Sequence, residues 1–496
     1  MVEGALAGLA LLTPTALLWM TFGVVFTTVA AVIPGLGGVF AMAIMLPFAF
    51  TLPPEAALAM LMAAVAVEGT GNTITAVLFG VPGSATGVAT VLDGYPMAQK
   101  GEAARAISAG LTASALGGVL GALVLIGLLP FMRPLVLALG PPEFFAMILA
   151  AILLMSAVTE GSRLKSAVAG FGGLLVSFVG LEISTGLPRY TAGQVYLWDG
   201  IRLIPMTIGL FAIAEMLNLL RKGTSISGEA PVGRTDSRAQ VLQGIRDVFI
   251  AWRVTLQSST VGMLVGVAPG VGGAAAQFLA YTQAMKTSAK GKLYGTGEVE
   301  GVIAADAATN AKDGGSLVPT LAFGIPGTAT AALLLVGMIG AGVQPGPAML
   351  NENLPLTWML IWVLVIANIM AAGMLLFSAG QFSRLTSLKP AFLIPPIWAI
   401  SIFGAFATTR HLGDIVTVVV FGVVGYGMIL LGFSRANFII GFVLGVFLER
   451  FYLLSVRLHG FAFLYRPVVV GIISITLLVL LAPVLRRVLV RPSVKA

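Results

Sequence analysis

The chain has 496 residues, of which 58% are hydrophobic and only 10% are charged. Soluble domains carry roughly 25% charged residues, so this chain lacks the polar side chains that a fully water-exposed surface needs. The formal net charge of +8 comes mostly from Lys and Arg in the connections between apolar stretches, a pattern typical of cytoplasmic loops and not of a nucleic-acid-binding face. The absence of cysteine excludes disulfides, thiolate catalysis and cysteine metal sites.

Apolar stretches of about 20 residues recur along the chain, and each is long enough to cross a hydrocarbon core roughly 30 Å thick. A membrane β-barrel would need short segments that alternate apolar and polar residues, whereas residues 358–367 are apolar at every position. We therefore predict an all-α polytopic membrane protein with roughly 10–12 transmembrane segments. Glu3 and the lack of a basic residue before the first apolar stretch indicate no cleaved signal peptide.

The first half begins with an apolar segment over residues 16–33 that stops at Pro34-Gly35-Leu36-Gly37-Gly38 and resumes up to residue 50. Proline removes a helix donor and glycine relaxes the backbone, so we expect the helix to break there. The next helix meets the polar residues 68–73, which precede the octapeptide Phe79-Gly80-Val81-Pro82-Gly83-Ser84-Ala85-Thr86. Further spans are predicted near residues 106–129, 144–158, 166–181 and 203–220.

Between residues 221 and 253 the composition changes to Gly, Ser and charged residues. We predict a hydrophilic linker here and place it in the cytoplasm because of its arginines. It divides the chain into two transmembrane halves, residues 1–220 and residues 254–496.

The second half repeats the motifs of the first in the same order. Pro269-Gly270-Val271-Gly272-Gly273 comes first, and residues 323–330 then repeat the octapeptide with only Val/Ile and Ser/Thr exchanged. Paired motifs in one order indicate internal duplication, and we expect the two repeats to be inverted. A polar interruption is predicted at residues 312–316. Later spans are predicted near residues 355–378, 393–407, 415–432, 438–448 and 467–485.

The four predicted breaks indicate a binding site between the repeats. Irregular backbone at membrane depth is tolerated only inside protein or beside water, and free N–H groups at the ends of broken helices attract anions. Hydroxyl, amide and glycine residues near the breaks suit substrates and cations. The predicted substrate-binding residues are Asn72, Thr73, Gly83, Ser84, Thr86, Ser316, Gly327, Thr328 and Thr330. The predicted ion-binding residues are Gly35, Gly37, Thr70, Gly270, Gly272 and Asn310.

Two alternative interpretations stay open. Small residues also let membrane helices pack closely, so the glycines can be packing devices. The charged residues beside the breaks can be coupling groups, or Lys312 and Asp313 can simply neutralise one another. The two histidines are too isolated to predict a metal site, and no cofactor is expected beyond a coupling ion, Na⁺ or H⁺.

The motifs together resemble the large membrane (permease) subunit of the tripartite tricarboxylate transporters. The matching segments span nearly the whole chain: Pro34-Gly35-Leu36-Gly37, Pro82-Gly83-Ser84 with Asp93-Gly94-Tyr95-Pro96, Gly140-Pro141-Pro142-Glu143-Phe144, Gly209-Leu210-Phe211 with Glu215, Pro269-Gly270-Val271-Gly272, Gly324-Ile325-Pro326-Gly327 and Gln344-Pro345-Gly346-Pro347. The resemblance implies ion-coupled uptake of citrate-like carboxylates across a bacterial inner membrane. It also implies two partners, a small membrane subunit and a periplasmic solute-binding protein.

Two other function classes are kept as alternatives. A channel or a non-transporting scaffold would have the same composition. An intramembrane enzyme is less favoured, because the sequence has no Gly-x-Ser-x-Gly elbow, no metal-binding His pair and no P-loop lysine.

Overall fold

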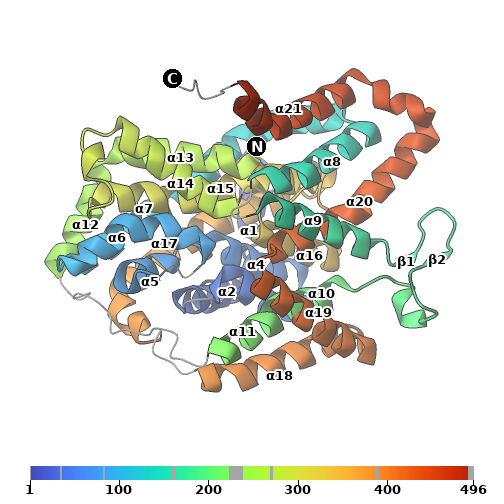
Figure 1. The fold of residues 1–496 in the computed structure, drawn as a ribbon. Helices are drawn as coiled ribbons and strands as arrows, with labels where there is room; N and C mark the ends of the chain where they lie inside the picture. Colours follow the sequence, from blue (N-terminus) through green and yellow to red (C-terminus); the bar gives the residue numbers. More distant parts are fainter. Residues whose placement is uncertain are drawn as a thin grey trace, which may run out of the picture.

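The computed structural model describes residues 2–33, 36–81, 84–158, 162–222, 238–268, 272–385 and 390–489. Within these ranges the chain is almost entirely helical, as predicted. The strands β1 (Gly180–Leu181) and β2 (Pro188–Arg189) form a short antiparallel ribbon at the edge of the molecule (Figure 1).

The first half folds into helices whose ends follow local signals. Thr13 caps α2 by accepting a hydrogen bond from the Ala16 amide, and Pro14 occupies the first helical turn, where its missing N–H costs nothing. The elements are α1 (Val2–Ala10), α2 (Pro14–Val32), α3 (Gly37–Ala49), α4 (Pro54–Val67), α5 (Asn72–Phe79), η1 (Ala85–Gly87), α6 (Val88–Gln99), α7 (Ala103–Ala138), α8 (Pro141–Val158), α9 (Arg163–Ser177), η2 (Val195–Leu197), α10 (Leu203–Thr207), η3 (Ile208–Ile213) and α11 (Ala214–Lys222).

The second half begins within the predicted linker, whose residues 223–237 lie outside the described ranges. Its described residues from 238 onward form all of α12 and the start of α13, and the two helices meet at a bend of 73°. The elements are α12 (Arg238–Ile250), α13 (Trp252–Val267), α14 (Gly272–Thr287), η4 (Gly291–Leu293), α15 (Val299–Phe323), α16 (Ala329–Gly340), η5 (Pro347–Leu350), α17 (Leu354–Leu385), α18 (Pro390–Thr409), α19 (Leu412–Leu431), α20 (Arg435–His459), η6 (Gly460–Tyr465) and α21 (Pro467–Leu489).

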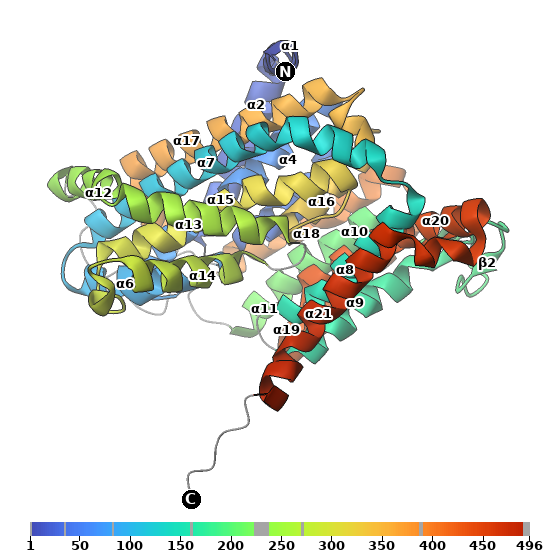
Figure 2. The ribbon, with the colours of Figure 1, turned by 90° about the horizontal axis from the view of Figure 1, so that it is seen from above.

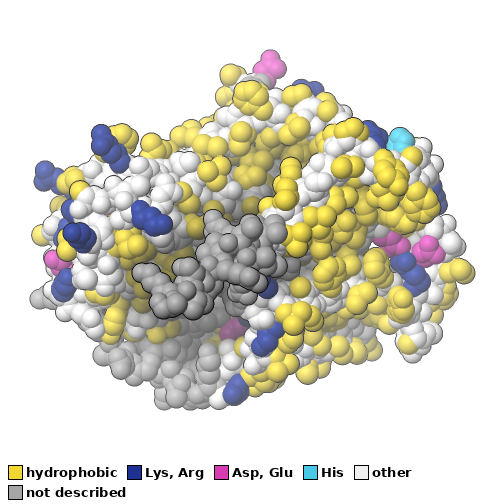
Figure 3. Space-filling model, turned by 45° about the horizontal axis from the view of Figure 1, so that its top comes forward, with side chains coloured by type: hydrophobic (Ala, Val, Ile, Leu, Met, Phe, Trp, Pro, Cys, Tyr) yellow, Lys and Arg dark blue, Asp and Glu magenta, His cyan; other side chains and the backbone are white. Residues whose placement is uncertain are grey.

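The described helices make this a multi-pass membrane protein. Seven of them are long and apolar enough to cross a membrane, or eight if α12 and α13 count as one bent span. This is fewer than the predicted number of crossings, and the described residues also contain five shorter apolar helical segments: Gly37–Ala49, Pro141–Met155, Ala329–Gly340, Ile394–Ala407 and Pro467–Leu481. Figure 3 shows hydrophobic side chains over much of the visible face, as lipid contact requires, and a group of Lys and Arg at its left edge with others scattered at the top, right and bottom.

The helices form two groups, and each group mixes the two halves of the chain. In the larger group α7 and α13 run beside α15, while α8, α9, α20 and α21 pack together to one side (Figure 2). Nearly all of the 25 residues of α15 are buried. Glycines permit this close packing, since a Cβ added to Gly117 of α7 would lie 2.1 Å from the carbonyl oxygen of Ala307.

The polar interruption predicted at residues 312–316 is absent, because α15 continues through it without a break. Lys312 and Asp313 form an ion pair, and the Ser316 hydroxyl donates to the Asp313 carbonyl oxygen. Gly314 and Gly315 lie against the backbones of Gly121 and Met263. The polar residues therefore have partners within the protein, and the helix does not need to open.

Candidate functional site

The two octapeptides match in backbone conformation at their described glycine and capping residues. Gly80 ends α5 in the left-handed region (φ 63°, ψ 16°), and Gly324 ends α15 in the same way (φ 67°, ψ 23°). Ser84 then caps η1 by accepting from the Thr86 amide, and Thr328 caps α16 by accepting from the Ala331 amide. Each octapeptide thus separates two helices, as predicted.

The first octapeptide brings its hydroxyls to Asn72, the first residue of α5. The Asn72 amide group donates to the Ser84 hydroxyl at 2.7 Å and to the Thr86 hydroxyl at 2.8 Å. Gln277 of α14 donates to the Thr86 carbonyl oxygen at 2.5 Å. The Asn72 side chain is 1% exposed, and its Oδ1 has no hydrogen-bond partner among the described residues. We call Asn72, Ser84 and Thr86 the amide–hydroxyl cluster.

The second octapeptide meets a buried group of charges. The Lys312 ammonium lies 2.6 Å from Asp313 Oδ1 and 3.7 Å from Glu68 Oε2. The Thr330 hydroxyl donates to the same Glu68 oxygen at 2.8 Å. Glu68 follows α4 and Thr330 lies in the first turn of α16, so this ion cluster of Glu68, Lys312, Asp313 and Thr330 joins the two halves of the chain.

The two clusters adjoin at the paired Gly-rich segments. A Cβ added to Gly273 would lie 2.2 Å from Thr86 Cγ2 and 2.6 Å from Lys312 Cε, so Gly273 contacts both clusters. Gly38 lies equally close to the Glu68 side chain. Gly37, at a φ of 63°, lies near Ser84. All four matched breaks therefore converge on one region at the interface of the halves.

A third polar group lies beside the ion cluster. The Asn310 amide group donates to the Thr70 hydroxyl at 2.8 Å, to Asn368 Oδ1 at 2.6 Å and to the Ala66 carbonyl oxygen at 3.2 Å. Asn310 is fully buried, and its own Oδ1 has no partner in the described part of the chain. Three neutral oxygens, from Thr70, Asn368 and Ala66, thus gather around the Asn310 amide nitrogen, and oxygens of this kind are ligands that a hard cation accepts.

Asp93, in the Asp-Gly-Tyr-Pro segment, fixes α6 to the start of α15. Its Oδ1 accepts from the backbone amides of Gly295, Gly297 and Glu298 at 2.8–2.9 Å, and its Oδ2 accepts from the Tyr281 hydroxyl. Three backbone donors stabilise a buried carboxylate. This segment therefore positions the octapeptide structurally.

The predicted site residues do not all lie in one cluster. Asn72, Ser84 and Thr86 come together, as do Thr70 and Asn310, whereas Thr73 instead donates to Asp306. Ser316 and Gly327 contact each other, Thr328 and Thr330 pair through their hydroxyls, and Gly272 begins α14. Gly35, Gly83 and Gly270 lie outside the described residues.

Sequence reasoning missed two residues of this region, Gln277 and Asn368. Each is a fully buried amide on a helix, and each bonds to a predicted site residue or its neighbour. A signal was available, because an amide in an apolar stretch needs a buried partner.

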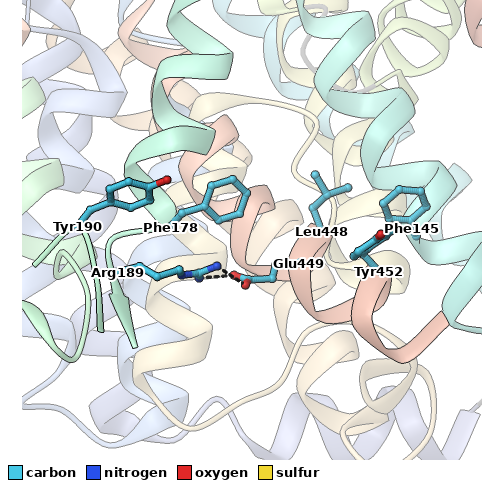
Figure 4. Close-up of a pocket in the computed structure, with 7 residues that line it drawn as sticks. All are labelled: Phe145, Phe178, Arg189, Tyr190, Leu448, Glu449 and Tyr452. Carbon is cyan, nitrogen blue, oxygen red and sulfur yellow. Dashed lines mark hydrogen bonds and ion pairs between the residues drawn. The ribbon is translucent and has the colours of Figure 1, made fainter. Parts of the chain in front are cut away.

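A cavity of about 880 Å³ reaches the start of the second octapeptide at Phe323 and Gly324. It adjoins a smaller pocket that shares Arg189 and Glu449. Figure 4 shows Arg189 of β2 directed at Glu449 of α20, and the two contacts are 2.8 and 3.0 Å long. The cavity is thus an approach from the protein surface toward one matched break.

A fold with duplicated helix breaks that meet at a buried polar region is typical of membrane transporters. Residues 17–440 match the family model described as tripartite tricarboxylate transporter TctA family. The chain belongs to this family. The predicted resemblance is thereby confirmed, and the chain is a membrane transporter component of tripartite tricarboxylate transport.

Two relatives from Agrobacterium vitis extend the comparison. The chain is 30% identical over 479 residues to an uncharacterized 52.8 kDa protein in the TAR-I ttuC' 3' region, covering 94% of this chain and 92% of that protein. It is 31% identical over 189 residues to an uncharacterized protein in the TAR-II ttuC' 3' region, covering 38% of this chain and 78% of that protein. No solved structure gives a significant match to the chain.

Proposed function

We propose that this chain is the permease subunit of an ion-coupled uptake system for citrate-like carboxylates and that it works by alternating access between two inverted repeats. The observation that carries the proposal is the convergence of the four matched breaks on polar clusters shared by the two halves. Helices that end at a common site can move as units around it while the site stays formed.

The substrate carboxylate binds between the amide–hydroxyl cluster and the ion cluster. Lys312 supplies positive charge, and a carboxylate that approaches it competes with Asp313, which is its nearest partner at 2.6 Å. The hydroxyls of Ser84 and Thr86 and the amide group of Asn72 supply neutral donors. The N-terminus of α16 adds a favourable dipole.

A sodium ion would find oxygen ligands at the Asn310 group. The Thr70 hydroxyl, the Ala66 carbonyl and the Asn310 and Asn368 amide oxygens all lie there, and none of them carries a charge. Neutral oxygens bind a monovalent cation and still let it leave.

Membership of the tripartite family supports the following partners and location. A small membrane subunit and a periplasmic solute-binding protein complete the system in a bacterial inner membrane. No chemical reaction on the substrate is part of this function, so the chain is not an enzyme.

Uptake by proteoliposomes tests the proposal. The permease is reconstituted with its two partners, and labelled carboxylates are offered with an ion gradient. Thr86→Val and Thr330→Val each remove one hydroxyl at constant volume, and each is expected to raise KM by about 10- to 100-fold because a buried polar partner is left unpaired. Thr260→Val is the matched control, because the exposed Thr260 hydroxyl bonds only to the Leu256 carbonyl of its own helix.

Three results would contradict the proposal. The parent protein would transport no carboxylate at all, the two site variants would behave like Thr260→Val, or flux would rise with substrate concentration without saturation. The last result would identify a channel.

A further inference from the structure

Asp306 is a buried carboxylate outside both clusters. It lies in α15 with 2% of its surface exposed. Its Oδ2 is 3.2 Å from the Thr73 hydroxyl of α5, and its Oδ1 is 2.8 Å from the Thr90 hydroxyl of α6. Since α5 and α6 flank the first octapeptide, one carboxyl group ties both arms of this hairpin to the central helix (Figure 1).

No described Lys, Arg or His forms an ion pair with Asp306. Helix α7 presents Gly110 to the carboxyl, since a Cβ added to Gly110 would lie 2.2 Å from Asp306 Oδ2. Several ionisable side chains on the surrounding helices have other partners: Asp93 bonds to Tyr281, Arg105 to Asp247 and Glu102, Lys312 to Asp313 and Glu68, and Glu300 to Lys290. Arg253 stacks on Trp252.

This environment fits a carboxylic acid better than a carboxylate. An ionised carboxylate that is removed from water without a cation is strongly destabilised, and two hydroxyl donors compensate only part of that loss. A protonated carboxyl donates one hydrogen bond and accepts another. Threonine can accept or donate, so Thr73 and Thr90 satisfy the acid fully.

We propose that Asp306 is a proton-binding site that couples transport to H⁺. In the closed arrangement its carboxyl is protonated and holds α5 and α6 against α15. When the hairpin separates from α15, water reaches the group, the O–H bond breaks, and the proton passes to that water, which leaves a hydrated carboxylate. The hairpin closes again only after Asp306 has taken up a proton, so each closure of the hairpin binds one H⁺. This coupling role depends on the transport function proposed above.

Asp306→Asn separates coupling from binding. Asparagine has the shape of the protonated acid, and it donates and accepts hydrogen bonds but cannot release a proton. Exchange of internal for external labelled carboxylate is expected to persist, while net accumulation driven by a pH gradient is lost. Glu352→Gln, which changes an exposed loop carboxyl, is expected to leave both activities unchanged.

Infrared difference spectroscopy of the purified protein detects the protonated carboxyl group directly. The spectrum of the parent at low pH minus that at high pH is expected to contain a carboxylic acid C=O band from a dehydrated group. This band should vanish in Asp306→Asn, shift in Thr90→Val, which removes one hydrogen bond, and persist in Glu352→Gln. Thr90→Val keeps the test available if Asp306→Asn does not fold.

The outcomes are separable. A band that is unchanged in Asp306→Asn overturns the proton site. Loss of exchange together with net uptake, or accumulation by Asp306→Asn driven by a pH gradient alone, overturns its coupling role. If the parent transports no carboxylate but the band behaves as described, the transport function fails while the proton site stands.

Discussion

At the scale of single residues, Lys312 and Lys290 show how burial changes the energetic role of an ion pair. Each lysine lies near two carboxylates, Lys312 beside Asp313 and Glu68, and Lys290 beside Glu298 and Glu300. The Lys312 side chain is 2% exposed, whereas that of Lys290 is 50% exposed. Water therefore solvates the Lys290 ammonium, whereas the buried Lys312 ammonium depends on its two carboxylate partners.

We predict that Lys312→Met lowers the free energy of unfolding by about 3–5 kcal/mol, because two buried carboxylates lose their cation. Lys290→Met should cost less than about 1 kcal/mol, since exposed pairs contribute little. Thermal unfolding of both purified variants in detergent measures the difference. Equal losses of stability would show that the Lys312 pair is solvated in the membrane protein and not buried.

At the scale of elements, the packing of α7 against α15 depends on glycine at defined positions. A Cβ added to Gly117 would collide with the Ala307 carbonyl oxygen at 2.1 Å, whereas Gly127, on the same helix, has no atom within 4 Å. Alanine is the better helix former at both places by roughly 1 kcal/mol. Only the contact with α15 distinguishes the two positions.

We therefore predict opposite signs for the two substitutions. Gly127→Ala should raise the melting temperature slightly, while Gly117→Ala should lower the free energy of unfolding by about 1–3 kcal/mol, because overpacking forces the helices apart. Melting curves of the two variants recorded side by side give the comparison. A stabilised Gly117→Ala protein would mean that α7 and α15 separate without loss.

The elements also show which features a sequence reveals. The breaks at the octapeptides were predictable because proline and glycine limit the backbone locally. The continuity of α15 was not, because Lys312 is neutralised partly by Glu68, which lies in the other half of the chain. The clustering of Asn72 with Ser84 and Thr86 was foreseen from their proximity to one break. The contribution of Asn368 required the fold, since Asn368 lies in α17 and belongs to none of the motifs.

At the scale of the whole molecule, the two halves share their helix groups. The first-half helix α7 packs against the second-half helices α13 and α15, and α8 and α9 pack against α20. Buried hydrogen bonds also cross between the halves, from Asn310 to Thr70 and from Thr330 to Glu68. The apolar and polar partners of each half are thus mainly in the other one.

We predict that a chain cut between Lys222 and Arg238 reassembles when both fragments are made in the same cell. Each fragment alone should be degraded or aggregate, since its polar residues would face lipid without partners. Affinity purification through a tag on one fragment, followed by detection of the other, measures assembly. If one fragment accumulates alone as a monodisperse protein, the halves are independent units.

The composition of α15 also bears on how the protein is made. This helix carries Asp306, Lys312 and Asp313, and it is not among the described helices that are apolar enough to cross a membrane. Each such charge costs roughly 2.5–3.5 kcal/mol when a segment leaves the translocon alone. During biosynthesis α15 must therefore wait until α7 and α13, which are synthesised first, can receive it, so this largely buried helix enters the bilayer by packing against helices that are already there.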